Sequence, residues 1–327
     1  MQVTLGEKIL TPPVFLAPLA GITDRPFRDL VQGFGAGLVV SEMVASQEMV
    51  QAKPGVRERA ELSLDVENTA VQLAGREARW MAEAARLVAD RGARIIDINM
   101  GCPAKKVTNG YAGSALLKTP DHALRLIEAV VEAVDVPVTL KTRLGWDENL
   151  LNAADVAHRA EAAGVQMVTI HGRTRAQFYK GHADWRAIRA VKAAVAIPVI
   201  ANGDITDQPS ARQALAQSGG DGVMVGRGAQ GHPWRLAEIA HDIFGSPAPL
   251  VPEGPALADL VSGHYQAMLG FYGANLGLRV ARKHLGWYMD GAATPAGLRR
   301  VILTARAPSE VLRLLPEALA ATGQVAA

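Results

Sequence analysis

The sequence predicts an α/β protein, a (β/α)8 TIM barrel followed by a small all-helical C-terminal domain. Three observations support this prediction. Short apolar runs alternate with amphipathic helical segments throughout residues 13–245. The apolar runs number eight, which is the strand count of a closed (β/α)8 barrel. After Phe244 the strand pattern stops and only helical patterns remain.

Each strand is expected where an apolar run is bounded by turn residues. The eight runs are Val14–Ala17, Leu38–Glu42, Ala70–Leu73, Ile95–Asn99, Val138–Thr142, Met167–His171, Val199–Ala201 and Gly222–Val225. The clearest helices between them carry apolar residues three and four apart. They are Arg76–Asp90, His122–Val134, Ala154–Ala163 and Trp185–Val195. Strands that alternate with helices form right-handed parallel βαβ units.

The two ends of the chain are expected to differ from the barrel. Residues 2–10 predict a small hairpin over the barrel's N-terminal end. Four prolines in residues 245–255 indicate a linker, so we expect a barrel domain over 1–245 and a helical domain over 246–327. An open doubly wound sheet is the alternative. It is disfavoured because the first turn, Ala17-Pro18-Leu19-Ala20-Gly21, is not a GxGxxG fingerprint.

The composition limits the class of protein. The 327 residues are 49% hydrophobic and carry a net charge of +2, which neither demands nor excludes a nucleic-acid partner. A single cysteine allows no intramolecular disulfide and fits a reducing cytoplasm. The N-terminus lacks a signal-peptide pattern, and no apolar run approaches the roughly 18 residues of a membrane helix. We therefore expect a cytoplasmic protein without a membrane or metal partner.

Polar or glycine-rich groups follow nearly every predicted strand. In chain order they are Pro18-Leu19-Ala20, Glu42, Gln72, Asn99 with Cys102, Lys141 with Arg143, His171, Asn202-Gly203-Asp204 and Gly226-Arg227. The carboxyl ends of barrel strands form the active-site face. Any one of these residues alone would be unremarkable, but the whole set predicts a site for a large polar ligand.

The last two strand ends predict a phosphate site. Loops after the seventh and eighth strands bind phosphate in many barrels, and glycine lets backbone amides approach an oxyanion. Either glycine pair alone is more often a plain turn. The sequence leaves three roles open for Lys141. It could neutralise an anionic ring, form a Schiff base or bind phosphate. Gln72 suits the edge of a heterocycle, because its amide both donates and accepts hydrogen bonds.

The only cysteine, Cys102, lies in the segment Asp97-Ile98-Asn99-Met100-Gly101-Cys102-Pro103. A lone cysteine is usually a small buried hydrophobe. This one directly follows the fourth predicted strand, where barrel enzymes place working groups. A thiol is a plausible acid, because its ordinary pKa of about 8.5 keeps it protonated near neutral pH.

Several stretches together resemble the tRNA-dihydrouridine synthases. They are Ala17 to Asp24, Val71-Gln72-Leu73, Asp97 to Pro103, Leu140 to Gly145, His171 to Arg175, Asn202 to Ile205 and Gly226-Arg227. The resemblance runs from about residue 10 to about residue 310. Ala104-Lys105-Lys106-Val107 after the cysteine is most similar to the bacterial DusB-like branch.

The resemblance implies a reaction and its cofactors. Members of this family join an FMN-holding (β/α)8 barrel to a helical tRNA-binding domain. They reduce the 5,6 double bond of a D-loop uridine with NADPH as the reductant, and DusB-like members act at position 17. Hydride passes from flavin N5 to uracil C6, and C5 takes a proton on the opposite face. The partners implied are tRNA and NADPH, with the enzyme as a monomer.

The resemblance also assigns residues. Those around FMN are Pro18, Leu19, Ala20, Gln72, Lys141, His171, Asn202, Gly203, Asp204, Gly226 and Arg227. Cys102 is the proton donor, and Asn99 and Arg143 orient the target base. Arg175 contacts RNA, and Lys105 and Lys106 are placed to meet RNA phosphate at the pocket mouth. Three rival functions are another FMN-dependent barrel oxidoreductase acting on a small molecule, a non-catalytic RNA-binding barrel and, last, an aldolase-like barrel.

Overall fold

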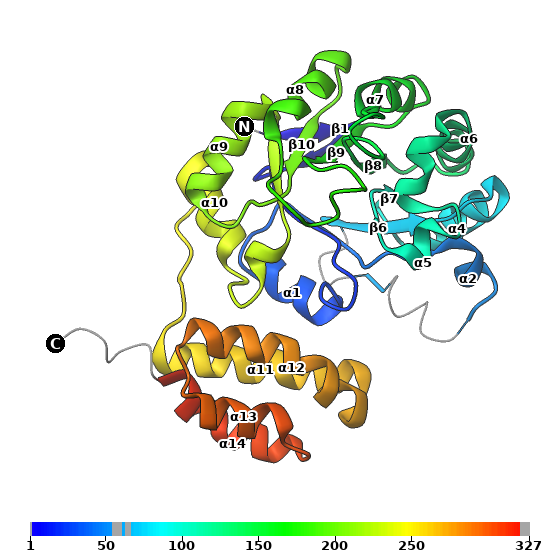
Figure 1. Ribbon diagram of the computed structural model, residues 1–327. Coiled ribbons are helices and arrows are strands. Elements are labelled where there is room, and N and C mark those ends of the chain that lie inside the picture. Colours follow the sequence, from blue (N-terminus) through cyan, green and yellow to red (C-terminus); the bar gives the residue numbers. More distant parts are fainter. Residues whose placement is uncertain (1, 54–60, 63–66, 321–327) are drawn as a thin grey trace.

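The protein, described by a computed structural model over residues 2–53, 61–62 and 67–320, is built around a closed parallel barrel (Figure 1). Its strands are β3 (Val14–Leu16), β4 (Leu38–Val40), β6 (Thr69–Ala74), β7 (Ile95–Met100), β8 (Val138–Arg143), β9 (Met167–His171), β10 (Val199–Asn202) and β11 (Gly222–Val225). Each pairs in parallel with the next, and the pairing of β4 with β6 closes the ring. All eight predicted strands and the predicted barrel are confirmed.

Helices surround the barrel as the periodicity predicts. They are α1 (Arg25–Gly33), α2 (Ser46–Val50), α4 (Ala78–Asp90), α5 (Lys105–Thr108), α6 (Pro120–Val131), α7 (Ala153–Ala162), α8 (Trp185–Ala194), α9 (Gln208–Ser218) and α10 (Arg235–Phe244). Two 3-10 turns are η1 (Gly113–Lys118) and η2 (Arg227–Ala229). The apolar faces of the helices cover the outer faces of the strands in one continuous core.

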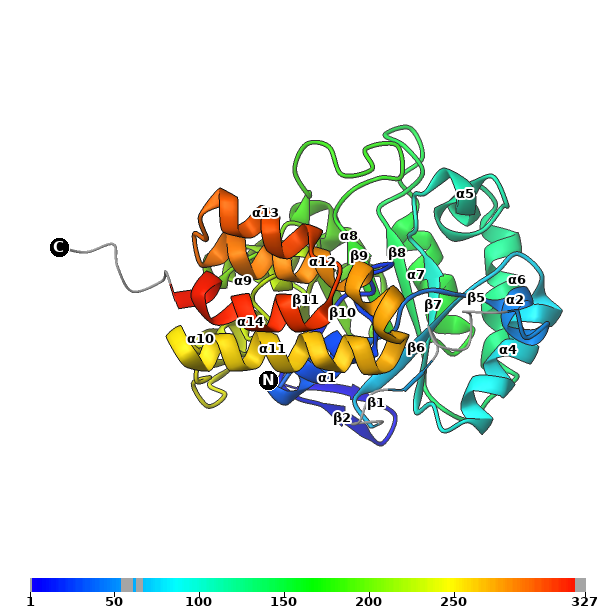
Figure 2. The same ribbon diagram turned by 90° about the horizontal axis from the view of Figure 1, so that it is seen from below.

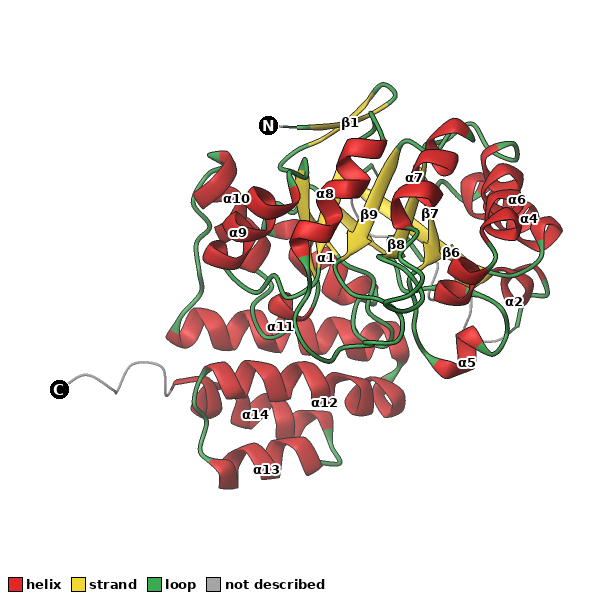
Figure 3. Ribbon diagram, turned by 45° about the horizontal axis from the view of Figure 1, so that its top comes forward, coloured by secondary structure: helices red, strands yellow, loops and turns green. Residues whose placement is uncertain are grey.

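A hairpin seals the N-terminal end of the barrel, as predicted. Its strands, β1 (Val3–Leu5) and β2 (Lys8–Leu10), are antiparallel. Val3, Leu5 and Leu10 pack in one cluster with inward-facing residues of the strands, such as Phe15 and Ile95. Figure 3 shows the hairpin at one end of the barrel and the long loops at the other. The sealed end leaves only the carboxyl ends of the strands open to a ligand.

The second strand is interrupted, which the sequence pattern did not indicate. The Ser41 amide still donates to the Ala70 carbonyl over 2.9 Å, and after it the chain leaves the ladder and rejoins it as β5 (Val44–Ala45), which also pairs with β6. The run predicted at Leu38–Glu42 therefore ends at Val40 as a regular strand. This break gives Glu42 and Met43 a place at the open end of the barrel.

Within the described residues up to 320, four helices follow the barrel and pack on one of its sides (Figure 2). They are α11 (Gly254–Tyr272), α12 (Ala274–Gly291), α13 (Ala296–Thr304) and α14 (Pro308–Leu319), and they share an apolar cluster of their own. The ring of Phe27 in α1 meets the ring of His284 in α12 at a tilt of 44°, with ring centroids 4.9 Å apart. Lys283 donates to the Gly21 carbonyl over 3.0 Å, so α12 also holds the loop after β3. No helix in the described part of the chain has the length and apolarity to span a membrane.

A buried carboxyl group lies between the barrel and these helices. Asp24 caps α1 by accepting a hydrogen bond from the Phe27 amide over 3.0 Å, and Tyr272 of α11 faces the same carboxyl group. Only 2% of Asp24 is exposed. Burial raises the pKa of Asp24 from 3.8 to about 6, although the Phe27 amide and Tyr272 act in the opposite direction.

We predict that Asp24→Asn stabilises the protein more at about pH 8 than at about pH 4. Because the folded pKa exceeds the ordinary value of 3.8, the wild type loses stability as the pH rises through about 4 to 6. Asparagine keeps the helix cap but carries no charge. The variant's advantage in unfolding free energy should grow across this window by up to about 3 kcal/mol. Chemical denaturation at both pH values measures it, and an advantage independent of pH would contradict the assignment.

Candidate active site

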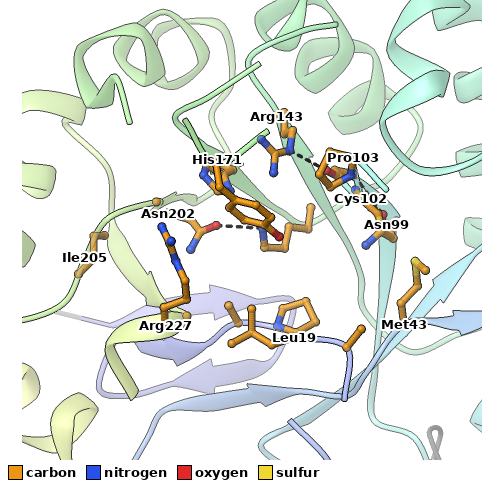
Figure 4. A pocket seen from close by; sticks show the side chains of 18 of the residues that line it. Leu19, Met43, Asn99, Cys102, Pro103, Arg143, His171, Asn202, Ile205 and Arg227 are labelled. Carbon is orange, nitrogen blue, oxygen red and sulfur yellow. Dashed lines mark hydrogen bonds between the residues drawn. The ribbon is translucent and has the colours of Figure 1, made fainter. Parts of the chain in front are cut away.

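A cavity of about 470 Å³ opens at the carboxyl ends of the barrel strands (Figure 4). Fourteen of the residues predicted for the site line it. They are Pro18, Leu19, Ala20, Gln72, Asn99, Cys102, Lys141, Arg143, His171, Asn202, Gly203, Asp204, Gly226 and Arg227. These residues come from strands and loops up to about two hundred positions apart, and the barrel brings them to one place.

Three predicted residues lie outside this cavity. Lys105 and Lys106 are exposed on α5, the short helix that follows Cys102. Arg175 is half-buried beside α5, where its Nη2 lies 3.4 Å from Oγ1 of Thr108. Its guanidinium also covers the ring of Trp146, 4.6 Å from the centroid. All three residues therefore belong to the protein surface around the cavity and not to its lining.

The inward-facing residues follow the period of two that strands impose. On β7, Ile95 belongs to the apolar cluster at the sealed end, and Asp97 and Asn99 follow at alternate positions toward the open end. On β8, Lys141 and Arg143 follow in the same way and line the cavity. The barrel interior is thus apolar at the hairpin and polar at the loops.

A chain of hydrogen bonds runs from the barrel interior to the cysteine loop. Asp97 accepts from Thr139 Oγ1 over 2.6 Å and from Gln72 Nε2 over 2.7 Å. Gln72 Oε1 accepts from Asn99 Nδ2 over 2.8 Å. Asn99 Oδ1 then accepts from the Cys102 amide over 3.0 Å. This chain fixes the amide orientations of Gln72 and Asn99 and the position of Cys102.

Lys141 is held in the cavity by a neutral amide. Lys141 is 9% exposed, and its Nζ donates to Asn202 Oδ1 over 3.0 Å. Asn202 in turn donates to the Met224 carbonyl over 2.8 Å, so its oxygen faces the lysine. Burial, followed by the nearby Arg143 charge, lowers the pKa of Lys141 to about 8. An anion bound beside Lys141 would favour its charged form.

Arg143 donates three hydrogen bonds to backbone carbonyls. Nε donates to Gly101 over 2.7 Å, and Nη1 donates to Thr174 and Phe178 over 3.0 Å and 2.9 Å. The side chain therefore joins the cysteine loop after β7 to the loop after β9. Its Nη2 group is not among these donors.

His171 is a neutral group in this site. Burial and then the charges of Lys141, Arg143, Arg173 and Arg227 lower the pKa of His171 well below its ordinary value of 6.5. Arg173 Nη1 lies 3.3 Å from His171 Nε2, which makes that nitrogen the acceptor. His171 is therefore a hydrogen-bonding side chain and not a cation near neutral pH.

Asp204 turns its carboxylate toward two arginines. Arg173, which is 2% exposed, pairs with Oδ2, and Arg227 Nη2 pairs with Oδ1 over 3.2 Å. These arginines and the Ala183 amide hold the pKa of Asp204 below 3.8, against the effect of burial. Gly203 adopts a φ of 106°, a conformation that favours glycine. The acidic side chain thus orients Arg227 at the edge of the cavity.

The sequence prediction missed several residues of the site. Met43, Tyr179, Ile205 and Thr206 also line the cavity. Tyr179 lies eight positions beyond the end of β9, so a search confined to strand ends does not find it. Asp97 and Arg173 lie under the lining and support it. Their period-two spacing from Asn99 and His171 was the available signal.

The arrangement offers a thiol, fixed amides and cations around a space for a planar polar ligand. The half-buried thiol of Cys102 shares the cavity with Lys141 and Arg227, and Leu19 and Ala20 provide an apolar surface. Glu42 accepts a hydrogen bond from the Gly21 amide and so holds the loop that carries Leu19 and Ala20. Among the described residues, no group of three or more His, Cys, Asp or Glu is placed to hold a metal ion.

Comparison with solved structures shows the fold. Histamine dehydrogenase from Rhizobium sp. 4-9 matches with a TM-score of 0.56 and 15% identity, covering 81% of this chain and 50% of that one. A 2-naphthoyl-CoA reductase complex matches with a TM-score of 0.57 and 13% identity, covering 73% of this chain and 51% of that one. At these identities the likeness concerns the fold alone.

Comparison with families and curated proteins shows the relationship. A family model described as dihydrouridine synthase (Dus) matches residues 15–323. A probable tRNA-dihydrouridine synthase of Rhodobacter capsulatus is 65% identical over 319 residues, which cover 97% of this chain and 98% of the relative. A tRNA-dihydrouridine synthase B of Xanthomonas campestris is 46% identical over 313 residues, covering 95% and 93%. By its sequence along nearly its whole length, the chain belongs to the dihydrouridine synthase family.

Proposed function

We propose that this protein reduces a uridine in the D-loop of tRNA to 5,6-dihydrouridine, with FMN as its cofactor and NADPH as the reductant. The observation that carries the proposal is one cavity that brings the only thiol together with fixed amides, Lys141 and Arg227. The family membership and the names of the relatives support the formation of dihydrouridine in tRNA. The resemblance to the DusB-like branch implies position 17 as the target.

The donor set of the cavity fits FMN. When bound, FMN would supply the hydride chemistry that links NADPH to C6 of the uracil. Lys141 would neutralise the negative charge of the reduced ring at its polar edge. Gln72 and the neutral His171 would hydrogen-bond to the ring, with backbone groups of Pro18, Leu19 and Ala20 against it.

The phosphate of FMN would lie at the loops after β10 and β11. Gly203 and Gly226 let the backbone approach an oxyanion closely, and Asn202 leads into the first loop. Asp204 contributes through its backbone, because its carboxylate is directed to Arg173 and Arg227. Arg227 supplies the positive charge, with half of its side chain exposed.

Cys102 would donate the proton to C5 of the uracil. Hydride at C6 and a proton at C5 together saturate the double bond, and the thiolate left behind regains its proton from solvent. Asn99 holds the Cys102 amide, so the loop that carries the thiol has a fixed position. Arg143 would reach the base through Nη2 while its other donors join the two loops beside the base.

The tRNA would meet the protein around the cavity. Lys105, Lys106 and Arg175 surround the cysteine loop and would contact RNA phosphates. The helices α11–α14 would form the tRNA-binding domain beyond the barrel, which spans residues 1–245 in this proposal. We infer that the enzyme acts as a monomer in the cytoplasm.

A single assay separates this proposal from its rivals. Purified protein should show a flavin absorption band and should oxidise NADPH faster when tRNA lacking dihydrouridine is added. A small-molecule oxidoreductase would show the flavin band with no response to tRNA. A non-catalytic RNA-binding barrel would bind tRNA without NADPH oxidation.

We predict that Cys102→Ala retains FMN but loses uridine reduction. Removal of a general acid typically lowers the rate by about 10²–10⁴-fold. Dihydrouridine formation under single-turnover conditions measures the change, and the flavin spectrum checks that the site is intact. Turnover at the wild-type rate would remove Cys102 from the mechanism.

We predict that Arg227→Ala weakens FMN retention. Loss of a hydrogen bond to a charged group costs about 1.5–3 kcal/mol, which corresponds to roughly a 10- to 150-fold rise in Kd. Arg212→Ala is the matched control, because Arg212 pairs with Asp242 on the outer helices. The FMN content after dialysis provides the measurement. Equal retention by wild type and Arg227→Ala would show that the phosphate lies elsewhere.

A further inference from the structure

Two exposed aromatic residues adopt backbone conformations that normally favour glycine. Tyr111 has a φ of 56° and is 73% exposed, and Phe178 has a φ of 57° and is 42% exposed. Positive φ is uncommon for bulky residues because the Cβ atom crowds the backbone. Such strain, where it persists, often belongs to a functional surface.

Tyr111 occupies the position after α5 at which helices favour glycine. The Tyr111 amide donates to Thr108 over 3.1 Å, and the Ala112 amide donates back to Val107 over 3.3 Å. The second bond, which spans five residues, is typical of a helix that ends with a left-handed residue. Glycine fits that position without strain, whereas the tyrosine ring is held largely in solvent.

Phe178 occupies a similar place in a tight turn. The Lys180 amide donates to the Gln177 carbonyl over 2.8 Å, which closes a four-residue turn with Phe178 at its second position. A positive φ there favours glycine or asparagine. Phe178 meets Tyr179 edge-on, with ring centroids 4.8 Å apart, and still leaves much of its ring exposed.

Both aromatic residues belong to loops that border the cavity. The loop with Tyr111 leads into Ser114, whose amide donates to the Cys102 carbonyl over 3.1 Å. The carbonyl of Phe178 accepts from Arg143, a residue of the cavity lining. Arg175 lies 3.4 Å from Thr108, so the two loops also meet each other. In Figure 3, α5 and the loops at the open end of the barrel lie on the same side of the molecule.

The charge around these rings fits a polyanion. Lys105 and Lys106 lie on α5, shortly before Tyr111 in the chain. Lys180 closes the turn that holds Phe178. All three lysines are exposed. Exposed aromatic rings with lysines beside them match single-stranded RNA, in which bases stack on rings and phosphates meet cations.

We propose that Tyr111 and Phe178 are stacking contacts for unpaired bases of the tRNA that flank the target uridine. The proposal rests on the proposed function, because it takes tRNA as the substrate. A base drawn into the cavity leaves its neighbours unstacked, and stacking on these rings would offset part of that cost. The strained backbones hold both rings outward for this contact.

The test replaces each residue by glycine, which removes the ring and relieves the strain together. For Tyr111→Gly and Phe178→Gly, we expect the Kd and KM for tRNA to rise about five-fold or more each. The Tm should stay equal or increase, since glycine suits a positive φ. FMN content should not change. Tyr111→Phe and Phe178→Tyr, which keep a ring, should bind tRNA as the wild type does.

Two controls separate stacking from other effects. Ala52→Gly relieves a φ of 53° at an exposed position without removing a ring, so it should leave tRNA binding unchanged. The salt dependence of tRNA binding should keep its slope in the glycine variants, because no phosphate contact is lost. A reduced slope would show instead that these loops act through phosphate contacts.

The outcomes distinguish this inference from the proposed function. Unchanged tRNA Kd and KM in both glycine variants would overturn the stacking role, and so would a lowered Tm without a binding defect. If the wild type binds tRNA but forms no dihydrouridine, the proposed function fails and the Kd values still test the stacking role. If the wild type binds no tRNA, both fail.

Discussion

The closed barrel places polar side chains in a space from which bulk water is largely excluded, so these side chains must satisfy one another. A buried polar group without a partner costs about 1–3 kcal/mol. Asp97 is 4% exposed and Gln72 is 1% exposed, yet both carboxylate oxygens of Asp97 and both ends of the Gln72 amide make hydrogen bonds. Their bonds continue through Asn99 to the Cys102 amide. The position of the thiol therefore depends on a carboxyl group in the barrel interior.

The same constraint explains the distribution of charge in the site. Lys141 is held by an amide oxygen, and the acidic Asp204 is directed to Arg173 and Arg227. The surplus of positive charge faces the cavity, where a phosphate and a reduced ring would balance it. Burial, followed by the charges of these cations, keeps the pKa of His171 well below its ordinary value, so the ring stays neutral. The α12 helix also fixes the loop after β3, because Lys283 donates a hydrogen bond to the Gly21 carbonyl next to the apolar surface.

Much of this could be predicted from the sequence, because strand alternation and strand ends are local signals. The barrel, the hairpin and the gathering of Gln72, Cys102, Lys141 and Arg227 followed from position along the chain. Contacts between distant segments did not. Arg143 could be placed at the site, but its three bonds to carbonyls depend on how the loops fold. Tyr179 reaches the cavity from a turn well past its strand, and local periodicity carries no signal for such a return.

The chemistry of the cavity and the family of the chain converge on the conversion of a tRNA uridine to dihydrouridine. The most direct measurement maps dihydrouridine in tRNA from cells with and without the gene for this protein, and from deletion cells that express Cys102→Ala. We expect one D-loop position to lose dihydrouridine in the deletion, to regain it with the wild-type protein and to remain unmodified with the variant. An unchanged dihydrouridine map in the deletion cells would contradict the account.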